Sequence, residues 1–189
     1  MKVTRQKAQA NRAHIVETAS ALFRERGYDG VGIADLMAAA GFTQGGFYKH
    51  FRSKADLMAE SAAGAITKSA ELAGDASVQD FIELYLSREH RDNRDTGCTL
   101  AALCGDAARK EDQVRGTFAA GIETQLAALR DNAGTPDSED SAHGRARRIA
   151  VMAQAIGAIV LSRACPDDSP LADEILLASR EAILASLKP

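Results

Sequence analysis

The stretch GFTQGGFYKHFRSK, residues 41–54, gathers side chains that could bind a nucleic acid. Tyr48, Lys49 and His50 are consecutive hydrogen-bond donors, which suit phosphates or base edges. They follow two adjacent glycines (45–46), placed where a helix should begin, although glycine costs about 1 kcal/mol there relative to alanine. Without side chains, this backbone could approach the groove of a duplex closely. The alternative is that the glycines mark a surface turn and the aromatic residues belong to an ordinary core.

Two short helices are expected on either side of Gly41. Apolar spacing predicts a helix over residues 33–40, which Gly41 ends. Thr43 is placed to cap the next helix through its hydroxyl, and Phe47 and Phe51, four residues apart, give that helix a buried side. Two short helices joined by a tight turn form a helix-turn-helix, in which the second helix enters the major groove of DNA.

The rest of the chain is also expected to be helical. Long amphipathic runs recur without a convincing alternating strand, so the sequence predicts an all-α protein of about nine helices. Besides the helix capped by Thr43, the expected helices cover about residues 8–26, 33–40, 53–73, 77–90, 99–109, 111–132, 143–164 and 170–187. Ser53 and Ser77, each followed three residues later by an aspartate, are helix-start signals. Residues 134–141 are expected to form a loop.

Charge is distributed unevenly along the chain. The net charge is −3, but residues 1–54 carry nine basic and four acidic residues, a net of +5, which leaves −8 for residues 55–189. A basic head on an acidic body suggests a polyanion partner for the head alone. The alternative is a chance fluctuation of surface charge.

Several classes of protein are disfavoured. The N-terminus is polar and basic without the apolar run of a signal peptide. The most apolar stretch, residues 150–161, is far shorter than the ~20 residues of a membrane span. Three cysteines without a CxxC do not predict a disulfide framework, and the four histidines show no metal-ligand spacing. We therefore expect a cytoplasmic protein with no membrane partner, no metal and no cofactor.

A set of residues between about positions 12 and 57 resembles the DNA-binding domain of the TetR family of bacterial transcriptional repressors. The residues that carry the resemblance are Ile15, Leu22, Phe23, Gly27, Tyr28, Ala40, Gly41, Phe47, Tyr48, His50, Phe51, Ser53 and Lys54. They cover about a quarter of the chain and are specific as a set. The resemblance implies a helix-turn-helix domain at residues 1–54 and a larger helical ligand-binding and dimerisation domain at residues 55–189.

By position, the resemblance also assigns DNA contacts. Gln44, Gly46 and Lys49 fall where the family reads bases, as Gln can bond adenine and Lys guanine. The predicted DNA-binding residues are Thr43, Gln44, Gly45, Gly46, Tyr48, Lys49, His50 and Lys54. Phosphate contacts are expected from Thr43, Tyr48, His50 and Lys54. Lys2, Arg5 and Lys7 form a basic arm before the first helix, which we expect to contact the DNA backbone or minor groove. The alternative is a disordered tail. One departure is that residues 32–34, Gly-Ile-Ala, lack the family's usual Ser or Thr cap at this helix start.

The body is expected to hold an inducer and to form a homodimer. A dimer would present two reading helices to a palindromic operator. The last two helices are the candidates for the dimer interface. The first carries a stripe of Ile149, Ala153, Ile156, Gly157 and Val160, and the second carries Ile175, Ala178, Ala182 and Ile183. The alternative is that both stripes belong to the intrachain core. The candidate ligand-binding residues are Phe81, Tyr85, Cys98, Phe118, Gln125 and Met152, with ordinary core as the alternative.

Cys98 could be a sensor. It stands at a predicted helix N-terminus beside Arg94, where the helix dipole and the cation would favour the thiolate. Some TetR-family regulators with a Gly-Cys here resemble electrophile or oxidant sensors; the alternative is a small buried hydrophobic residue. A thiol-dependent enzyme is a competing function, but no motif supplies a base, so we expect no enzymatic activity. A third alternative is an adaptor that binds an acidic protein, and the sign of regulation, repression or activation, stays open.

Overall fold

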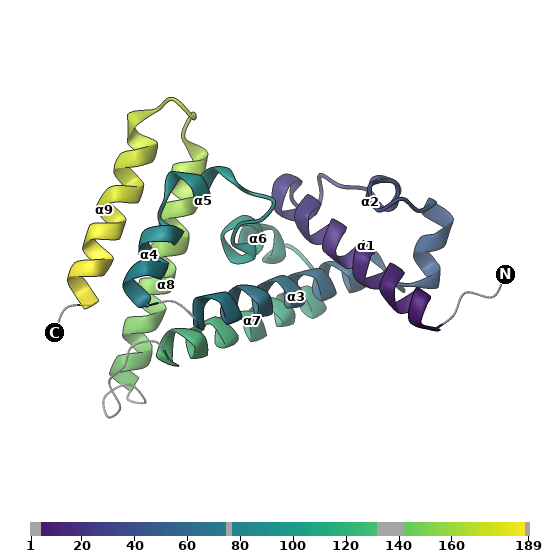
Figure 1. The fold of residues 1–189 in the computed structure, drawn as a ribbon, viewed down its shortest axis with the longest axis horizontal. Helices are drawn as coiled ribbons and strands as arrows, with labels where there is room; N and C mark the ends of the chain where they lie inside the picture. The colour runs from purple at the N-terminus through teal and green to yellow at the C-terminus, as the bar shows by residue number, and fades with distance from the viewer. Residues whose placement is uncertain (1–4, 75–76, 132–141, 188–189) are drawn as a thin grey trace.

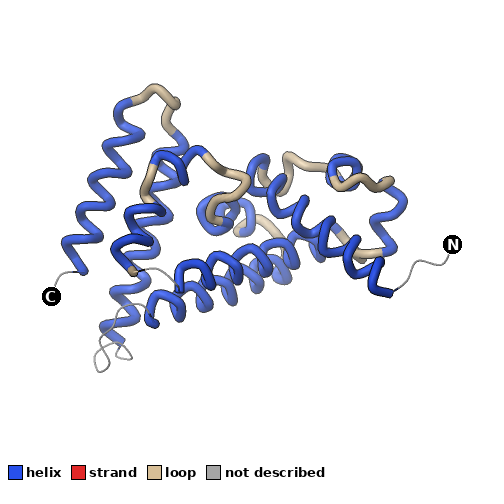
Figure 2. Tube along the Cα trace, in the orientation of Figure 1, coloured by secondary structure: helices blue, strands red, loops and turns tan. Residues whose placement is uncertain are grey.

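The computed structural model describes residues 5–74, 77–131 and 142–187, and all regular structure in these ranges is helical. The elements are α1 (Arg5–Arg26), α2 (Ile33–Ala39), the 3₁₀-helix η1 (Gln44–Lys49), α3 (Lys54–Gly74), α4 (Val78–Tyr85), α5 (Arg88–Asp92), α6 (Thr99–Ala107), α7 (Asp112–Asp131), α8 (Ala142–Ala164) and α9 (Pro170–Leu187). The all-α prediction is confirmed, as Figure 2 shows. The predicted loop at 134–141 lies outside the described residues.

Most helix ends follow the predicted signals. Gly27 and Gly41 adopt φ angles of 75° and 77°, the left-handed conformation that ends α1 and α2 and that glycine adopts without steric cost. Ser53 Oγ accepts a hydrogen bond from the Asp56 N–H at 3.1 Å, and Ser77 Oγ does the same for Asp80. These caps satisfy backbone groups that a helix start leaves without partners.

Three local predictions were wrong. The expected helix over residues 77–90 breaks at Leu86, because Ser87 Oγ accepts from the His90 N–H at 3.1 Å and starts α5. The reading helix is η1, a 3₁₀-helix, and its two glycines disfavour regular α-helix. Arg5 and Lys7 lie in the first turns of α1 instead of in an arm before it, while Lys2 lies outside the described residues.

The elements form an elongated molecule, in which the predicted DNA-binding segment and the predicted dimer helices lie at opposite ends. In Figure 1, α1 and α2 lie at one end, the α8–α9 pair lies at the other, and the long helices α3 and α7 run side by side between them. The α6 helix lies between the two ends and contacts α1, α3, α7 and α8. It is therefore placed to connect the body with the helix-turn-helix.

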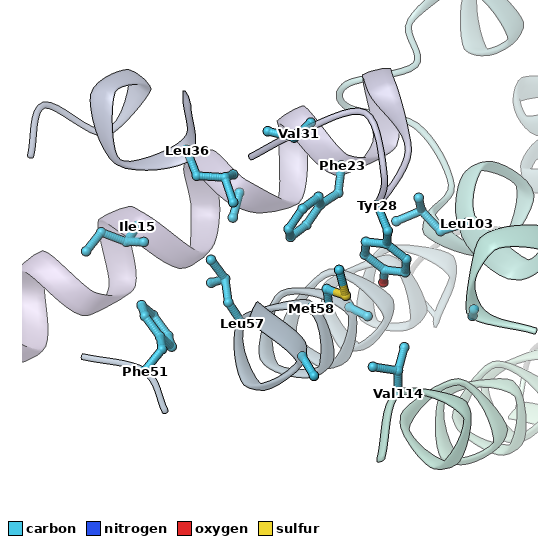
Figure 3. Close-up of a cluster of buried hydrophobic side chains, with 14 of the residues drawn as sticks. Ile15, Phe23, Tyr28, Val31, Leu36, Phe51, Leu57, Met58, Leu103 and Val114 are labelled. Atoms are coloured by element: carbon cyan, nitrogen blue, oxygen red, sulfur yellow. The ribbon is translucent and has the colours of Figure 1, made fainter. Parts of the chain in front are cut away.

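The largest buried cluster crosses the predicted boundary between residues 54 and 55. It joins α1 and α2 residues such as Phe23 and Leu36 to α6 and α7 residues such as Leu103 and Val114. Figure 3 shows Tyr28 at the centre of this cluster, among side chains from both parts of the chain. The division at residue 54 stays a prediction, because one continuous core serves both parts.

Candidate nucleic-acid interface and ligand cavity

One side of the η1 segment is fixed in the core. Phe47 and Phe51 are 0% and 3% exposed, and their ring centroids lie 5.4 Å apart. From α1, the Arg12 guanidinium lies 4.3 Å above the Phe51 ring and donates to the His50 carbonyl, and it also pairs with Glu60. These contacts hold η1 in one orientation against α1 and α3.

The opposite side of η1 is exposed. Thr43, Gln44, Gly45 and Lys49 are all exposed, and the ring of Tyr48 is 69% exposed although it is large and mainly apolar. A hydroxyl donor, an amide, an aromatic ring and a cation are thus exposed within one short segment. This combination can contact both phosphates and base edges.

The two adjacent glycines have different surroundings. A Cβ atom added at Gly45 would have no neighbour within 4 Å, whereas one added at Gly46 would lie 3.5 Å from the Met37 side chain. Gly46 is half-buried against α2, and Gly45 is exposed. Gly45 is therefore the position where the backbone is bare.

Three of the predicted contact residues lie differently from the simple expectation. Thr43 precedes η1, but its side chain makes no capping hydrogen bond, so the predicted hydroxyl cap was wrong. Lys54 Nζ donates to the Tyr28 carbonyl, and burial lowers the pKa of this lysine. His50 is half-buried between Phe42 and Phe51. The phosphate roles of these residues stay predictions.

A mainly apolar cavity lies in the body. Its empty space is about 440 Å³, which includes solvent at its open mouth. Its lining residues are Ser69, Phe81, Ile82, Tyr85, Cys98, Leu100, Gln125, Leu129, Val151, Met152, Ala155 and Ile156. Five of the six predicted ligand-binding residues are among them. Phe118 is not; it is 4% exposed and packs edge-on to Tyr28 in the core. That the five lining residues contact a ligand stays a prediction.

Polar atoms at one wall of the cavity are linked through His90. His90 Nδ1 lies 2.6 Å from the Tyr85 carbonyl, and Nε2 lies 3.2 Å from the Cys98 amide nitrogen. A neutral ring with the proton on Nδ1 satisfies both contacts, because the Cys98 N–H then donates to Nε2. Burial is the main cause that lowers the pKa of His90. The histidine thus closes the loop between α5 and α6.

Sequence reasoning missed this histidine. His90 and Cys98 belong to different elements, and no spacing rule joins them. Ser87, three residues before His90, was the available signal for the short helix α5, and it carried no information on the ring's partners. Ser69 and Leu129, also in the cavity wall, were likewise missed, since their positions depend on how α3 and α7 pack.

Comparisons with known proteins agree with the helix-turn-helix geometry. The family model described as "Bacterial regulatory proteins, tetR family" matches residues 15–61, which include α2, η1 and the start of α3. Residues 15–61 therefore form a DNA-binding domain of the TetR-family type. Among curated TetR-family relatives, AcrR of Shigella flexneri is 40% identical over 57 residues, 30% of this chain and 26% of AcrR. DhaR of Mycobacterium sp. (strain GP1) is 49% identical over 43 residues, 23% of this chain and 22% of DhaR. The chain thus aligns with about a quarter of the length of these relatives.

Solved TetR-family structures extend the likeness to the whole fold. NemR of Escherichia coli, in its reduced form, matches with a TM-score of 0.74 over 92% of this chain and 95% of its own, at 18% identity. A TetR-family regulator of Cytophaga hutchinsonii matches with a TM-score of 0.72 over 98% of both chains, at 17% identity. At this identity the matches establish the fold alone. They cover more than nine tenths of the chain, whereas the curated matches cover 30% and 23% of it.

The exposed residues of α8 and α9 include several large apolar side chains. Its large side chains, between 42% and 60% exposed, are Ile149, Val160, Leu161, Leu171 and Leu177. Ala153, Ala178 and Ala182 are exposed as well, while Ile156, Gly157 and Ile175 are half-buried. Ile183 is 0% exposed in the intrachain core, so its expected place on a dimer face was wrong.

The cysteines and the acidic and histidine side chains form no disulfide or metal cluster in the described residues. All three cysteines are free thiols; burial is the main cause that raises the pKa of Cys104 to about 11. No group of three or more histidine, cysteine or acidic residues in the described part of the chain is arranged to hold a metal ion. Within residues 5–74, 77–131 and 142–187, no helix has both the length and the hydropathy of a membrane span.

Proposed function

We propose that this protein is a DNA-binding transcriptional regulator, a repressor that leaves a palindromic operator when a small-molecule inducer fills the cavity. The observation that carries the proposal is η1, which buried Phe47 and the adjacent buried Phe51 anchor while Gln44, Gly45 and Lys49 stay exposed. The match of residues 15–61 to the TetR-family model supports the same conclusion.

The test is selection of binding sites from random DNA, followed by titration of variants on the selected operator. Lys49→Ala removes a base contact, so it should weaken operator binding by about 1–3 kcal/mol and relax sequence preference. Tyr48→Ala should weaken binding to all sequences alike, because a phosphate contact does not read bases. Lys68→Ala, an exposed lysine on α3, is the control for loss of charge. A Tyr48→Ala protein with full affinity would contradict the phosphate role.

We propose that the protein acts as a homodimer through α8 and α9. Isolated exposed leucines are common, but two helices that pack together, α8 and α9, expose five large apolar side chains as well as small residues. Leu161→Asp should therefore yield monomers in sedimentation velocity experiments and weaken operator binding. Leu72→Asp, at a leucine on α3 that is 66% exposed, is the matched control and should leave the dimer intact.

Polar contacts of the α6 region with the helix-turn-helix supply a route from cavity to DNA. On one side, Arg24 of α1 donates to the Asp95 carbonyl, in the loop that leads to Cys98. On the other, Asp106 of α6 accepts from the Tyr28 N–H at 2.8 Å. A ligand that shifts α6 would move α1, and DNA would then weaken ligand binding by the same coupling free energy.

As the second candidate, the inducer reacts with Cys98. The thiol lies in the cavity wall and is half-buried. With an α,β-unsaturated carbonyl, the sulfur would bond to the β carbon while the C=C π bond breaks, and the thiol proton would end on the α carbon. N-ethylmaleimide should release wild-type protein from operator and spare Cys98→Ser; Cys104→Ser is the control. Equal release of Cys98→Ser and wild type would dismiss this mechanism.

A binding role for the Cys98 region is favoured over a catalytic one. The one histidine beside Cys98 uses both ring nitrogens on backbone groups, the Tyr85 carbonyl and the Cys98 amide. Such a ring supports the loop instead of taking a proton from the sulfur. We therefore propose no enzymatic activity.

A further inference from the structure

The cavity is lined by uncharged residues, although the chain as a whole is rich in charged ones. Charged residues make up 26% of the sequence, yet the described lining residues include no Asp, Glu, Lys, Arg or His. The polar side chains in the lining are Ser69, Tyr85, Cys98 and Gln125. An anion in this cavity would lose its hydration without touching a charged lining residue, since Arg163, which acts electrostatically on Tyr85 and Cys98, is not part of the lining.

Tyr85 contributes a hydrogen-bond donor without an acceptor. Its hydroxyl oxygen is buried and has no hydrogen-bond partner, although buried polar groups are nearly always paired. Burial is the main cause that raises the pKa of Tyr85 well above its ordinary value. The nearby Cys98 thiol adds to the shift through its charge and a weak hydrogen-bonding interaction and Arg163 opposes it, but the phenol keeps its proton. Gln125 uses its amide Nε2 to donate to the Ile66 carbonyl at 3.1 Å. The phenol is therefore a buried donor available to a ligand, alongside the Ser69 hydroxyl and the second Nε2 hydrogen of Gln125.

We infer that the inducer is an uncharged, mainly apolar molecule with a carbonyl-type oxygen that accepts a hydrogen bond from the Tyr85 hydroxyl. This inference rests on the proposed function, because it names the ligand class of the same cavity. The apolar walls from Phe81, Leu129 and Met152 bind the hydrocarbon part, and the phenol binds the oxygen. Free carboxylates and phosphates are excluded because no lining cation offsets their desolvation.

Three naphthalenes with the same number of non-hydrogen atoms test the inference by calorimetric titration. They are 2-acetylnaphthalene, which offers a neutral acceptor, 2-isopropylnaphthalene, which offers none, and 2-naphthoate, which is charged. None carries an electrophilic C=C bond, so reaction at Cys98 does not enter. Wild type should bind the ketone with a dissociation constant below about 1 mM and at least about tenfold tighter than the carboxylate.

Two tyrosine variants isolate the hydroxyl. Tyr85→Phe should weaken the ketone about five- to tenfold, the loss of one hydrogen bond, and leave the hydrocarbon within about twofold. Tyr28→Phe is the matched control, because Tyr28 also has a buried hydroxyl without a partner, but it lies outside the cavity. This control should bind all three compounds as wild type does.

Three results would overturn the inference: a carboxylate that binds as tightly as the ketone, a Tyr85→Phe variant that weakens ketone and hydrocarbon equally, or no binding of the ketone up to about 1 mM. The order of the three ligands on wild type needs no variant, so a misfolded Tyr85→Phe protein would not block the test. DNA binding of the ligand-free protein is measured separately. Loss of DNA binding with the ligand order intact would refute the proposed regulator and leave the ligand class standing.

Discussion

Replacement of Gly45 by alanine should move stability and DNA affinity in opposite directions. A Cβ atom at this position meets nothing within 4 Å, and its φ is not positive, so the methyl group fits without strain. Alanine reduces the conformational freedom of the unfolded chain and should raise the free energy of unfolding by about 0.4–1 kcal/mol. On DNA the same methyl group would occupy the space where the backbone meets the groove. We expect at least a tenfold loss of operator affinity, about 1.4 kcal/mol.

Urea denaturation and fluorescence anisotropy on the selected operator measure the two effects. Gly116→Ala is the control, because Gly116 is exposed on α7 and an added Cβ also meets nothing within 4 Å. It should raise stability and leave operator affinity unchanged. A Gly45→Ala protein that gains stability and binds the operator like wild type would refute the close approach of this backbone to DNA.

Three further predictions concern stability. Gly121→Ala should lower the free energy of unfolding by about 1–3 kcal/mol in urea titrations, because its Cβ would lie 2.7 Å from Ile66 Cδ1 where α3 crosses α7. Because the pKa of His90 is lowered in the folded state, the unfolded state binds more protons below about pH 6.5. The free energy of unfolding of the wild type should therefore fall as the pH falls through that range, and that of His90→Gln should fall less. Arg91→Met should lower the free energy of unfolding by about 3 kcal/mol or more, which thermal unfolding measures. Arg91 is 1% exposed and donates to the Ser162 and Cys165 carbonyls, which would lose this donor.

Local signals predicted most of the helix boundaries because they act over three or four residues. Gly27 and Gly41 end helices through their left-handed backbone, and Ser53 and Ser77 start helices through their hydroxyls. These effects need no knowledge of the tertiary structure. The signal of Ser87 was of the same kind, but the apolar periodicity over residues 77–90 concealed it.

The cavity was predicted only in part because burial does not reveal which neighbour buries a side chain. Phe118 and Gln125 lie on one stripe of α7, seven residues apart, yet Gln125 lines the cavity and Phe118 packs on Tyr28. Likewise, the inward orientation of Lys54 follows from the Tyr28 carbonyl, a contact across 26 residues that periodicity cannot predict.

The buried cluster around Tyr28 makes the helix-turn-helix and the body a single cooperative folding unit. Because Phe23 and Leu36 share their packing with Leu103 and Val114, heating should melt both parts in one calorimetric transition. A peptide that ends before α3 would expose the apolar side of α1 to water. A chimera that joins this helix-turn-helix to the body of another regulator would therefore have to keep the body residues that pack around Tyr28, such as Leu103 and Val114.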